Sequence, residues 1–296
     1  MSPFSTLTNL VLLFDVDGVL VKYGEKTVPA EIVSLLRNKP LIKMLVSGKS
    51  LSWCWGIGEQ IRANAVFAEN ALVYRSRCRE APVLTADLVD LQRLKQIINF
   101  KVIAEAEYLA EITLDGVTSL ILFEPGKNIL TFWIEPKEKM RMFKLNDSLW
   151  TEEYVLQKIR HTILDNKLFI EIAGPFKDGG VDFLPMGVDK SRAVDKAKEL
   201  FPNKRIIVFG DDLNDIPMVS RDEVFAVTFL GNANPKVIER VMEKQAKGEG
   251  MIFEKPGYEG GLEDALAWIF KNQKEEKNDG NGYAKNNRGL SSAISL

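Results

Sequence analysis

The stretch Val11-Leu12-Leu13-Phe14-Asp15-Val16-Asp17-Gly18-Val19-Leu20 decides the fold, because it is an apolar run that ends abruptly in two carboxylates and a glycine. Such a run is typical of a strand buried on both faces of a parallel sheet. Asp15 and Asp17 then lie at the strand's carboxyl end, where open α/β sheets bind ligands. Residues i and i+2 of a strand point the same way, so the two carboxylates repel each other unless a cation joins them. The stretch therefore predicts a divalent metal site.

Two other interpretations of this stretch stay open when it is taken alone. Asp and Gly are common turn residues for local reasons, so a strand followed by a polar turn accounts for the same residues without any chemistry. A helix-loop-helix calcium loop also begins Asp-x-Asp, but its next carboxylate and glycine positions are not matched, and a strand precedes the motif here. Three distant segments favour the metal site, because they supply the parts that it lacks.

Composition predicts a protein with packed cores and no general affinity for polyanions. The chain has 296 residues, of which 46% are hydrophobic and 27% charged, so it is long enough for two domains. Its 39 Lys and Arg nearly balance its 41 Asp and Glu, which argues against nucleic acid or an anionic membrane surface as a partner. Only Cys54 and Cys78 are present, and residues 1–10 lack the basic residues of a signal peptide, so we expect a cytoplasmic protein without a membrane span.

The second segment is Ser47-Gly48-Lys49-Ser50, which lies between a predicted strand at 41–46 and a helix that begins near Leu51. A hydroxyl, a glycine and free amide donors at the start of a helix form an anion site. The alternative is that Ser47 or Ser50 only caps the helix.

The sequence changes character between about residues 75 and 185. Predicted helices at 88–100 and 151–164 are grouped there with strands at 109–114, 117–123, 129–134, 168–173 and 180–184, and Asp115-Gly116 is a strong hairpin signal. Helices grouped with hairpins suggest an α+β domain. We therefore predict a discontinuous core at 1–74 and 186–270, an inserted domain at 75–185, and a disordered polar tail at 271–296.

Strand and helix alternate again after the insert, and two further segments follow. Lys190 lies in the first turn of a predicted helix, where an ammonium conflicts with the helix dipole and indicates a compensating anion; the alternative is a surface lysine that solvent satisfies. A strand at 205–209 then breaks into Gly210-Asp211-Asp212-Leu213-Asn214-Asp215, and 225–229 is predicted as the last strand. Carboxylates at a second strand end, near Asp15, are costly unless they share a cation. The predicted class is thus α/β with a parallel sheet.

These four segments, in this order, resemble the four motifs of the haloacid dehalogenase superfamily of phosphatases. The position of the insert resembles the IIB class, which includes Cof-like and sucrose-phosphate phosphatases. The resemblance implies a Rossmann-like core with an inserted α+β cap. Glu69-Asn70-Ala71-Leu72-Val73-Tyr74 also resembles the turn Glu-Asn-Gly-Ala-x-x-Tyr of this class, with alanine in place of its glycine, and Val19 replaces the more usual threonine of the first motif.

The resemblance also implies roles for the matching residues. Asp15 is the expected nucleophile, Asp17 the general acid and base, and Lys190 the cation that neutralises the nucleophile and the transferred group. The expected magnesium ligands are Asp15, the Asp17 backbone carbonyl, Asp211 and Asp215. Phosphate oxygens are expected at Ser47, Gly48, Lys190 and Asn214.

The expected activity is Mg²⁺-dependent hydrolysis of a small phosphomonoester, with a sugar phosphate as the first candidate. A phosphomutase of the same class is the alternative, and a non-catalytic phospholigand-binding protein is a more distant one. Core motifs address only the phosphoryl group, so selectivity must come from the insert. A glycine-flanked loop at 174–180 carries Lys177 and Asp178, which we predict to be specificity residues. The alternative is that both are solvated turn residues. The sequence does not determine the oligomeric state.

Overall fold

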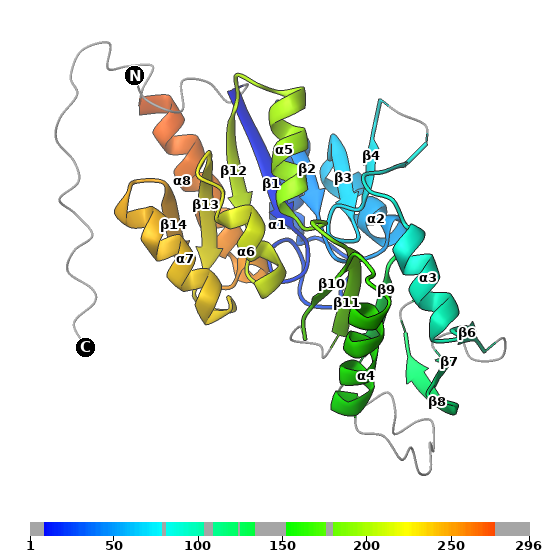
Figure 1. Cartoon of the computed structure of the whole chain (residues 1–296). Coiled ribbons are helices and arrows are strands. Elements are labelled where there is room, and N and C mark those ends of the chain that lie inside the picture. Colours follow the sequence, from blue (N-terminus) through cyan, green and yellow to red (C-terminus); the bar gives the residue numbers. More distant parts are fainter. Residues whose placement is uncertain are drawn as a thin grey trace.

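The computed structural model describes residues 9–78, 81–103, 109–123, 125–133, 152–175 and 180–275, and Figure 1 shows how they are arranged. The strands are β1 Leu10–Asp15, β2 Ile42–Val46, β3 Ala65–Ala68, β4 Val73–Ser76, β5 Val83–Leu84, β6 Lys101–Val102, β7 Leu109–Leu114, β8 Val117–Leu122, β9 Leu130–Trp133, β10 Ile170–Ala173, β11 Gly180–Pro185, β12 Arg205–Phe209, β13 Val224–Phe229 and β14 Gly250–Phe253. The helices are α1 Ala30–Arg37, α2 Leu51–Ile61, α3 Val89–Ile97, α4 Glu152–Asp165, α5 Ser191–Leu200, α6 Ile216–Val219, α7 Pro235–Ala246 and α8 Gly261–Glu275, with short 3₁₀ turns η3 Leu213–Asp215 and η4 Gly257–Glu259.

An eight-stranded sheet forms the larger part of the molecule, in the order β14-β13-β12-β1-β2-β3-β4-β5. The six strands from β14 to β3 are parallel, and β4 and β5 are antiparallel additions at one edge. β1 is completely buried and lies between β12 and β2, as its apolar run predicts. The predicted α/β class with a parallel sheet is confirmed.

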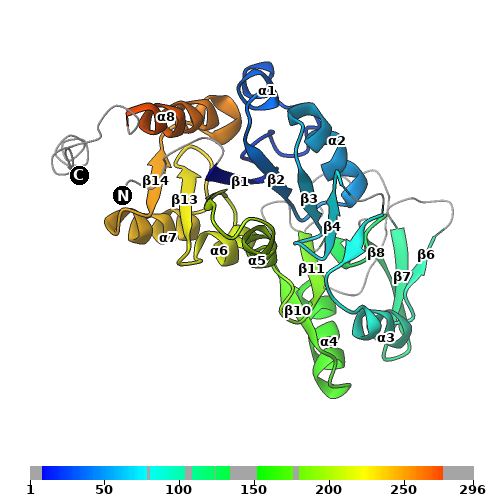
Figure 2. The ribbon, with the colours of Figure 1, turned by 90° about the horizontal axis from the view of Figure 1, so that it is seen from above.

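Alternate side chains of β1 build two separate cores. Leu12 and Phe14 belong to the core that α1, α2 and α8 cover, whereas Val11 and Leu13 belong to the core covered by α5, α6 and α7. Figure 2 shows these helices on opposite faces of the sheet. The period of two therefore gives a three-layer α/β/α arrangement from one short run of residues.

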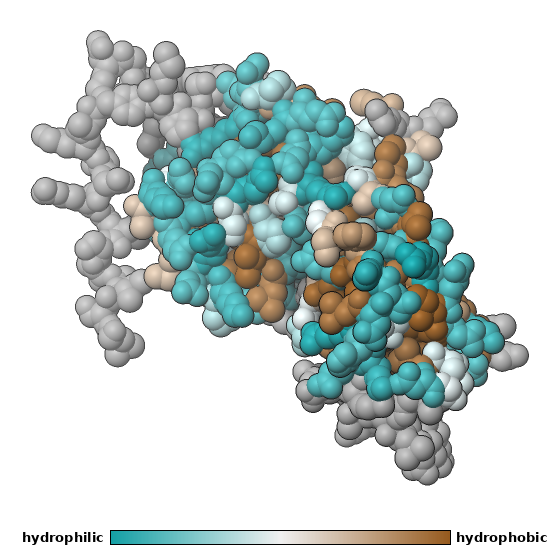
Figure 3. Space-filling model, viewed as in Figure 1, coloured by the Kyte–Doolittle hydropathy of each residue, from teal (hydrophilic) through white to brown (hydrophobic). Residues whose placement is uncertain are grey.

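The second part of the molecule contains two small antiparallel sheets, β10-β11-β9 and β6-β7-β8, together with α3 and α4. A bridge between Phe123 and Phe132 links the two sheets. In Figure 3 the most extensive hydrophobic surface lies over this part, and Leu164 and Phe169 are 72% and 67% exposed. The predicted helices and strands of the insert are present, with boundaries shifted by a few residues.

Some short elements differ from the predictions. Residues 225–229 are not the last strand, because β14 pairs with β13 beyond them. β5 and β6 were not predicted either, since two-residue strands carry no periodic signal. The large sheet continues past residue 74 through β4 and β5, and α8 continues to Glu275. Residues 276–296 of the predicted tail lie outside the described residues. No helix in the described ranges is long and apolar enough to span a bilayer.

Replacing Phe209 measures how much the packing of side chains on the central strands contributes to the stability of the protein. Its ring is fully buried and stacks on Phe14 with 4.7 Å between ring centroids. Phe209→Ala should lower the free energy of unfolding by about 3–5 kcal/mol, because it removes a large side chain from a close-packed core.

The matched control is Phe169→Ala, at a ring that is 67% exposed, which should change stability by less than about 0.5 kcal/mol. Denaturant unfolding followed by circular dichroism measures both variants. Equal midpoint shifts would contradict this assignment of the core.

Candidate active site

The candidate site lies at the carboxyl ends of β1, β2 and β12. The register pairs Asp15 with Val46 of β2 and Phe14 with Phe209 of β12, so the loops that follow these three strands begin at the same level. The chain runs from β1 towards β3 on one side and from β12 towards β14 on the other. Such a reversal of strand order opens a crevice where ligands bind in α/β sheets.

The Lys190 ammonium is the centre of this site. Its Nζ donates hydrogen bonds to Oδ1 of Asp15 at 2.5 Å and to Oδ1 of Asp215 at 2.6 Å, and the side chain is 1% exposed. Burial alone lowers the pKa of a lysine, but Asp15 and Asp215 outweigh it and hold the pKa of Lys190 above its ordinary value. Lys190 is the N-cap residue of α5, one position before the predicted first turn, and two carboxylates compensate its charge there.

Three buried carboxylates lie together here, and two of them, Asp15 and Asp215, bond to the Lys190 ammonium. Oxygen atoms of Asp15, Asp211 and Asp215 lie within 4.8 Å of one another, and all three residues are less than 5% exposed. Burial raises the pKa of Asp15 well above its usual range, repulsion by Asp215 and Asp211 adds to this, and Lys190 opposes it. One lysine does not neutralise three carboxylates, so a hard divalent cation with oxygen ligands fits this donor set.

Asp215 also shapes the loop that carries Asp211. Its Oδ2 accepts hydrogen bonds from the backbone amides of Asp211 at 2.8 Å and Asp212 at 3.0 Å. A Cβ atom on Gly210 would lie 2.6 Å from the Cβ of Asp215, so only glycine fits there. Asp212 instead accepts a bond from the Leu213 amide at 2.8 Å and caps the 3₁₀ turn. The closely spaced acidic residues of this segment thus have different tasks.

The phosphate-binding residues predicted from the second motif lie on the other side of the site. Ser47 is 2% exposed, and its Oγ accepts a hydrogen bond from the Lys49 amide at 3.1 Å. A Cβ atom on Gly48 would lie 3.4 Å from Oδ1 of Asn70 and 3.6 Å from Nδ2 of Asn214. The structure therefore brings Gly48 and Asn214 together around Asn70. Asp17 is half-buried, and its Oδ1 accepts a bond from the Gly24 amide at 3.1 Å.

The sequence profile of the haloacid dehalogenase-like hydrolases matches residues 12–243, which include all four motifs. The chain belongs to this family. The predicted family membership is confirmed, and so is the prediction of a hydrolase of this family. A search of curated protein sequences found no significant match.

Solved structures of haloacid dehalogenase proteins share the fold. A sucrose-phosphatase from Synechocystis sp. PCC6803, in complex with sucrose and phosphate, has a TM-score of 0.57 at 14% identity, over 88% of this chain and 98% of its own. A phosphatase from Bacteroides thetaiotaomicron has a TM-score of 0.57 at 17% identity, over 88% and 94%. The subclass IIB sugar phosphatase BT4131 has a TM-score of 0.54 at 15% identity, over 88% and 98%. The predicted Rossmann-like core of a haloacid dehalogenase protein is thereby confirmed.

Two residues that the sequence analysis missed hold Asp211 in this haloacid dehalogenase-like chain. The Tyr23 hydroxyl donates to Oδ2 of Asp211 at 2.7 Å, and Nδ2 of Asn232 donates to the same oxygen at 2.8 Å. A Cβ atom on Gly18, whose φ is +85°, would lie 2.2 Å from that oxygen, so glycine is required there. Asn232 follows the carboxyl end of β13, a position that marks site residues in parallel sheets. No pattern in the sequence marks Tyr23.

The turn at Glu69 and Asn70 joins the site to the inserted part. Oε2 of Glu69 accepts bonds from the backbone amides of Asn128 at 2.7 Å and Ile129 at 3.2 Å. Glu69, Asn70 and Ala71 all have positive φ, and Ala71 takes φ +68° where the related turn has glycine. The altered turn sequence therefore keeps a left-handed backbone, which these contacts with the insert help to hold. The predicted specificity residues Lys177 and Asp178 lie outside the described residues.

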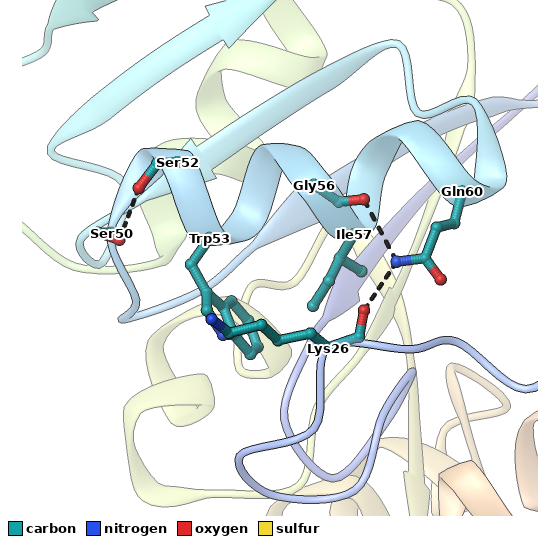
Figure 4. A pocket seen from close by; sticks show the side chains of 7 residues that line it. All are labelled: Lys26, Ser50, Ser52, Trp53, Gly56, Ile57 and Gln60. Atoms are coloured by element: carbon teal, nitrogen blue, oxygen red, sulfur yellow. Dashed lines mark hydrogen bonds between the residues drawn. The ribbon is translucent and has the colours of Figure 1, made fainter.

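A groove of about 450 Å³ runs along α2 beside the site. Figure 4 shows its lining of Lys26, Ser50, Ser52, Trp53, Gly56, Ile57 and Gln60. Gln60 links the two walls, because its Nε2 donates to the Lys26 carbonyl at 2.8 Å. None of the carboxylates around Lys190 lines this groove, so it is separate from that cluster.

Tyr23 offers a direct test of how Asp211 is oriented. Tyr23→Phe removes one of the two hydrogen bonds to Oδ2 and should weaken Mg²⁺ binding about tenfold, because a partner behind a metal ligand orients it. Isothermal titration calorimetry with Mg²⁺ measures the change.

The control variant is Tyr74→Phe, the same change on β4, which β1, β2 and β3 separate from β12 in the sheet. The Tyr74 ring packs on Phe67 and keeps that contact as phenylalanine, so this variant should bind Mg²⁺ as the wild type does. An unchanged affinity in Tyr23→Phe would mean that Asn232 alone orients the carboxylate.

Proposed function

We propose that this protein is a Mg²⁺-dependent phosphomonoester hydrolase that acts through an aspartyl-phosphate on Asp15. The observation that carries the proposal is the Lys190 ammonium, which lies 2.5 Å from Asp15 and 2.6 Å from Asp215 beside the third buried carboxylate, Asp211. Phosphoryl transfer needs mainly positioning and charge stabilisation, and this cluster supplies both.

In the first step an Asp15 carboxylate oxygen attacks phosphorus, and the bond between phosphorus and the ester oxygen breaks. Lys190 favours the ionised form of that carboxylate and orients it, although burial and the neighbouring carboxylates raise its pKa. Asp17 gives its proton to the departing alkoxide and then takes one from water. That water attacks phosphorus, the bond to Asp15 breaks, and inorganic phosphate leaves. The half-buried position of Asp17 leaves it accessible to a leaving group.

The residues that would hold Mg²⁺ are Asp15, the Asp17 backbone carbonyl and Asp211, with Asp215 direct or through water. When bound, the ion neutralises charge that develops on the phosphoryl oxygens. Tyr23 and Asn232 fix one oxygen of Asp211, so the carboxylate has a single orientation. Because Asp215 accepts two loop amides and the Lys190 ammonium, its movement is restricted as well.

Ser47, the Gly48 amide and Asn214 would bind the remaining phosphoryl oxygens. These groups carry no formal charge, and the loop that contains Ser47 and Gly48 ends at the start of α2, where free amides and the helix dipole favour an anion. Lys190 therefore provides positive charge on one side of the phosphoryl group, and neutral donors complete the other.

A sugar phosphate is the proposed substrate class, with residues 75–185 acting as a cap that selects it. The support comes from proteins of the same fold, a sucrose-phosphatase bound to sucrose and phosphate and a sugar phosphatase. Lys177 and Asp178 stay our prediction for part of this selectivity. Both cysteines are free, which supports a reducing cytoplasmic location.

A phosphate-release assay over phosphorylated sugars, polyol phosphates and phosphoglycolate tests the proposal. Free phosphate should appear in step with substrate loss and without a bisphosphate activator. Chelation should abolish turnover, Mg²⁺ should restore it, and Ca²⁺ should inhibit because its coordination shell is larger and looser. Full activity in excess chelator would contradict the metal role, and a positional isomer with little phosphate would point to a phosphomutase.

Asp15→Asn tests the nucleophile. The variant should fold normally and lose turnover by several decades, because an amide cannot form the covalent intermediate. Rates of phosphate release under saturating substrate measure the loss. Asp222→Asn, the same change at an exposed position, is the control and should keep wild-type turnover. More than about a hundredth of the wild-type rate in Asp15→Asn would argue for direct attack by water.

A further inference from the structure

A chain of hydrogen bonds joins the inserted part of the molecule to the proposed phosphate-binding loop. It begins at Lys127, whose Nζ donates to Oγ1 of Thr131 at 3.0 Å. Thr131 donates to Oδ1 of Asp182 at 2.5 Å, and Nδ2 of Asn70 donates to Oδ2 of Asp182 at 2.7 Å. At the far end, Nδ2 of Asn214 lies 3.4 Å from Oδ1 of Asn70.

All of the central members are buried. The side chains of Lys127 and Asp182 are 3% and 4% exposed, and Asn70 and Thr131 are 2% and 4% exposed as residues. Buried polar groups must satisfy one another, because water is not there to do so. Each member of this chain therefore has a definite donor or acceptor role.

Lys127 and Asp182 determine which group donates and which accepts in every hydrogen bond of the chain. Lys127 has only donors, so Thr131 must accept from it and use its own hydroxyl proton for Asp182. An ionised Asp182 has only acceptors, and it also lies 3.9 Å from the Lys127 ammonium. Asn70 must therefore turn its NH₂ group towards Asp182, and its oxygen must face the site. An amide that is otherwise able to flip has a single orientation here.

This orientation passes to Asn214. Because Asn70 presents an oxygen, Asn214 must present its NH₂ group to it, and not its carbonyl oxygen. Both amides border Gly48, since a Cβ atom there would lie within 3.6 Å of each. The second N–H of the Asn214 amide is then the group available to an oxygen atom bound beside Gly48.

We infer that Asp182 and Asn70 are positioning residues that orient the Asn214 amide as a hydrogen-bond donor to the phosphoryl group. This inference rests on the proposed function, since it needs a phosphoryl group beside Gly48. It differs from a purely structural role for Asp182, because it requires Asp182 to act through Asn214. Asp182 lies on β11, which returns from the insert to the core, so the insert contributes to the proposed phosphate site through this hydrogen bond.

A double-mutant cycle with inorganic phosphate as the probe tests the inference. In Asp182→Asn the carboxylate is replaced by an amide, so Asn70 is no longer restricted to one orientation. The dissociation constant for phosphate, measured by calorimetry with Mg²⁺ present, should rise at least fivefold. Asn214→Ala should raise it to a similar extent. The double variant should bind no more weakly than Asn214→Ala, because Asp182 acts only through the amide that is already missing.

Asp182→Asn also removes the negative charge that pairs with Lys127, so a second variant is needed that keeps this ion pair. Asn70→Ala keeps that pair and removes the middle of the chain, so it should weaken phosphate binding and show the same lack of additivity with Asn214→Ala. Thr113→Val is the control, because this hydroxyl on β7 bonds to Thr118, outside the chain, and phosphate affinity should stay within twofold of wild type. Melting temperatures confirm that each variant is folded.

Additive effects in both cycles, or unchanged phosphate affinity in Asp182→Asn and Asn70→Ala, would overturn the inference and leave the proposed function in place. A wild-type protein that neither binds phosphate nor hydrolyses any phosphomonoester would overturn both.

Discussion

Repulsion among Asp15, Asp211 and Asp215 is the constraint on which the rest of the structure depends. The three carboxylates are each less than 5% exposed, and the Lys190 ammonium bonds to two of them, so the site is stable only with further compensation. Backbone amides of the loop after β12, the Tyr23 hydroxyl and the Asn232 amide supply part of it. A divalent cation would supply the rest. The large sheet brings these acids together at one edge, and the surrounding loops hold them there.

This arrangement explains why positions 18 and 210 are occupied by glycine. Gly18 and Gly210 both lie against acidic side chains, at distances that no Cβ atom tolerates. Each follows a central strand, where the chain must turn while a carboxylate approaches its backbone, Asp211 at Gly18 and Asp215 at Gly210. The closely packed acids therefore leave room only for glycine at positions 18 and 210. A larger residue at either position would push the acids apart.

The insert influences the candidate site because it determines which way the Asn70 and Asn214 amides are turned. Buried amides are ambiguous donors and acceptors, so a site that uses Asn70 and Asn214 must determine how they are turned. Asp182 and Lys127 can each act in one sense only, and both belong to the insert. A conformational change that moved the insert would then alter the amides beside Gly48. In this way, a cap that selects the substrate would also influence the phosphate-binding loop.

Residue types and their spacing along the sequence determined the central strand, the order of the four motifs and the acidic and lysine residues of the site. They did so because apolar periodicity reports burial directly, and because carboxylates at the end of a buried strand need a cation or a hydrogen-bond donor beside them. Asp211 and Asp215 were singled out in this way, whereas Ser47, Gly48 and Lys190 were singled out by their positions at the starts of predicted helices. Short strands such as β5, β6 and β14 were missed because they are too brief or too exposed to show a period.

Only the tertiary structure decided which neighbours act on those acids. Tyr23 and Asn232 lie 188 and 21 residues from Asp211, and Asn70 lies 112 residues from Asp182, so no local pattern relates them. Hydrogen bonds between distant segments depend on where strands and loops are placed. A single tyrosine or asparagine in the sequence carries no pattern that tells whether it faces water or a buried carboxylate. The acids themselves could be recognised in the sequence because each follows a buried strand, whereas their partners depend on packing that the sequence specifies only through the whole fold.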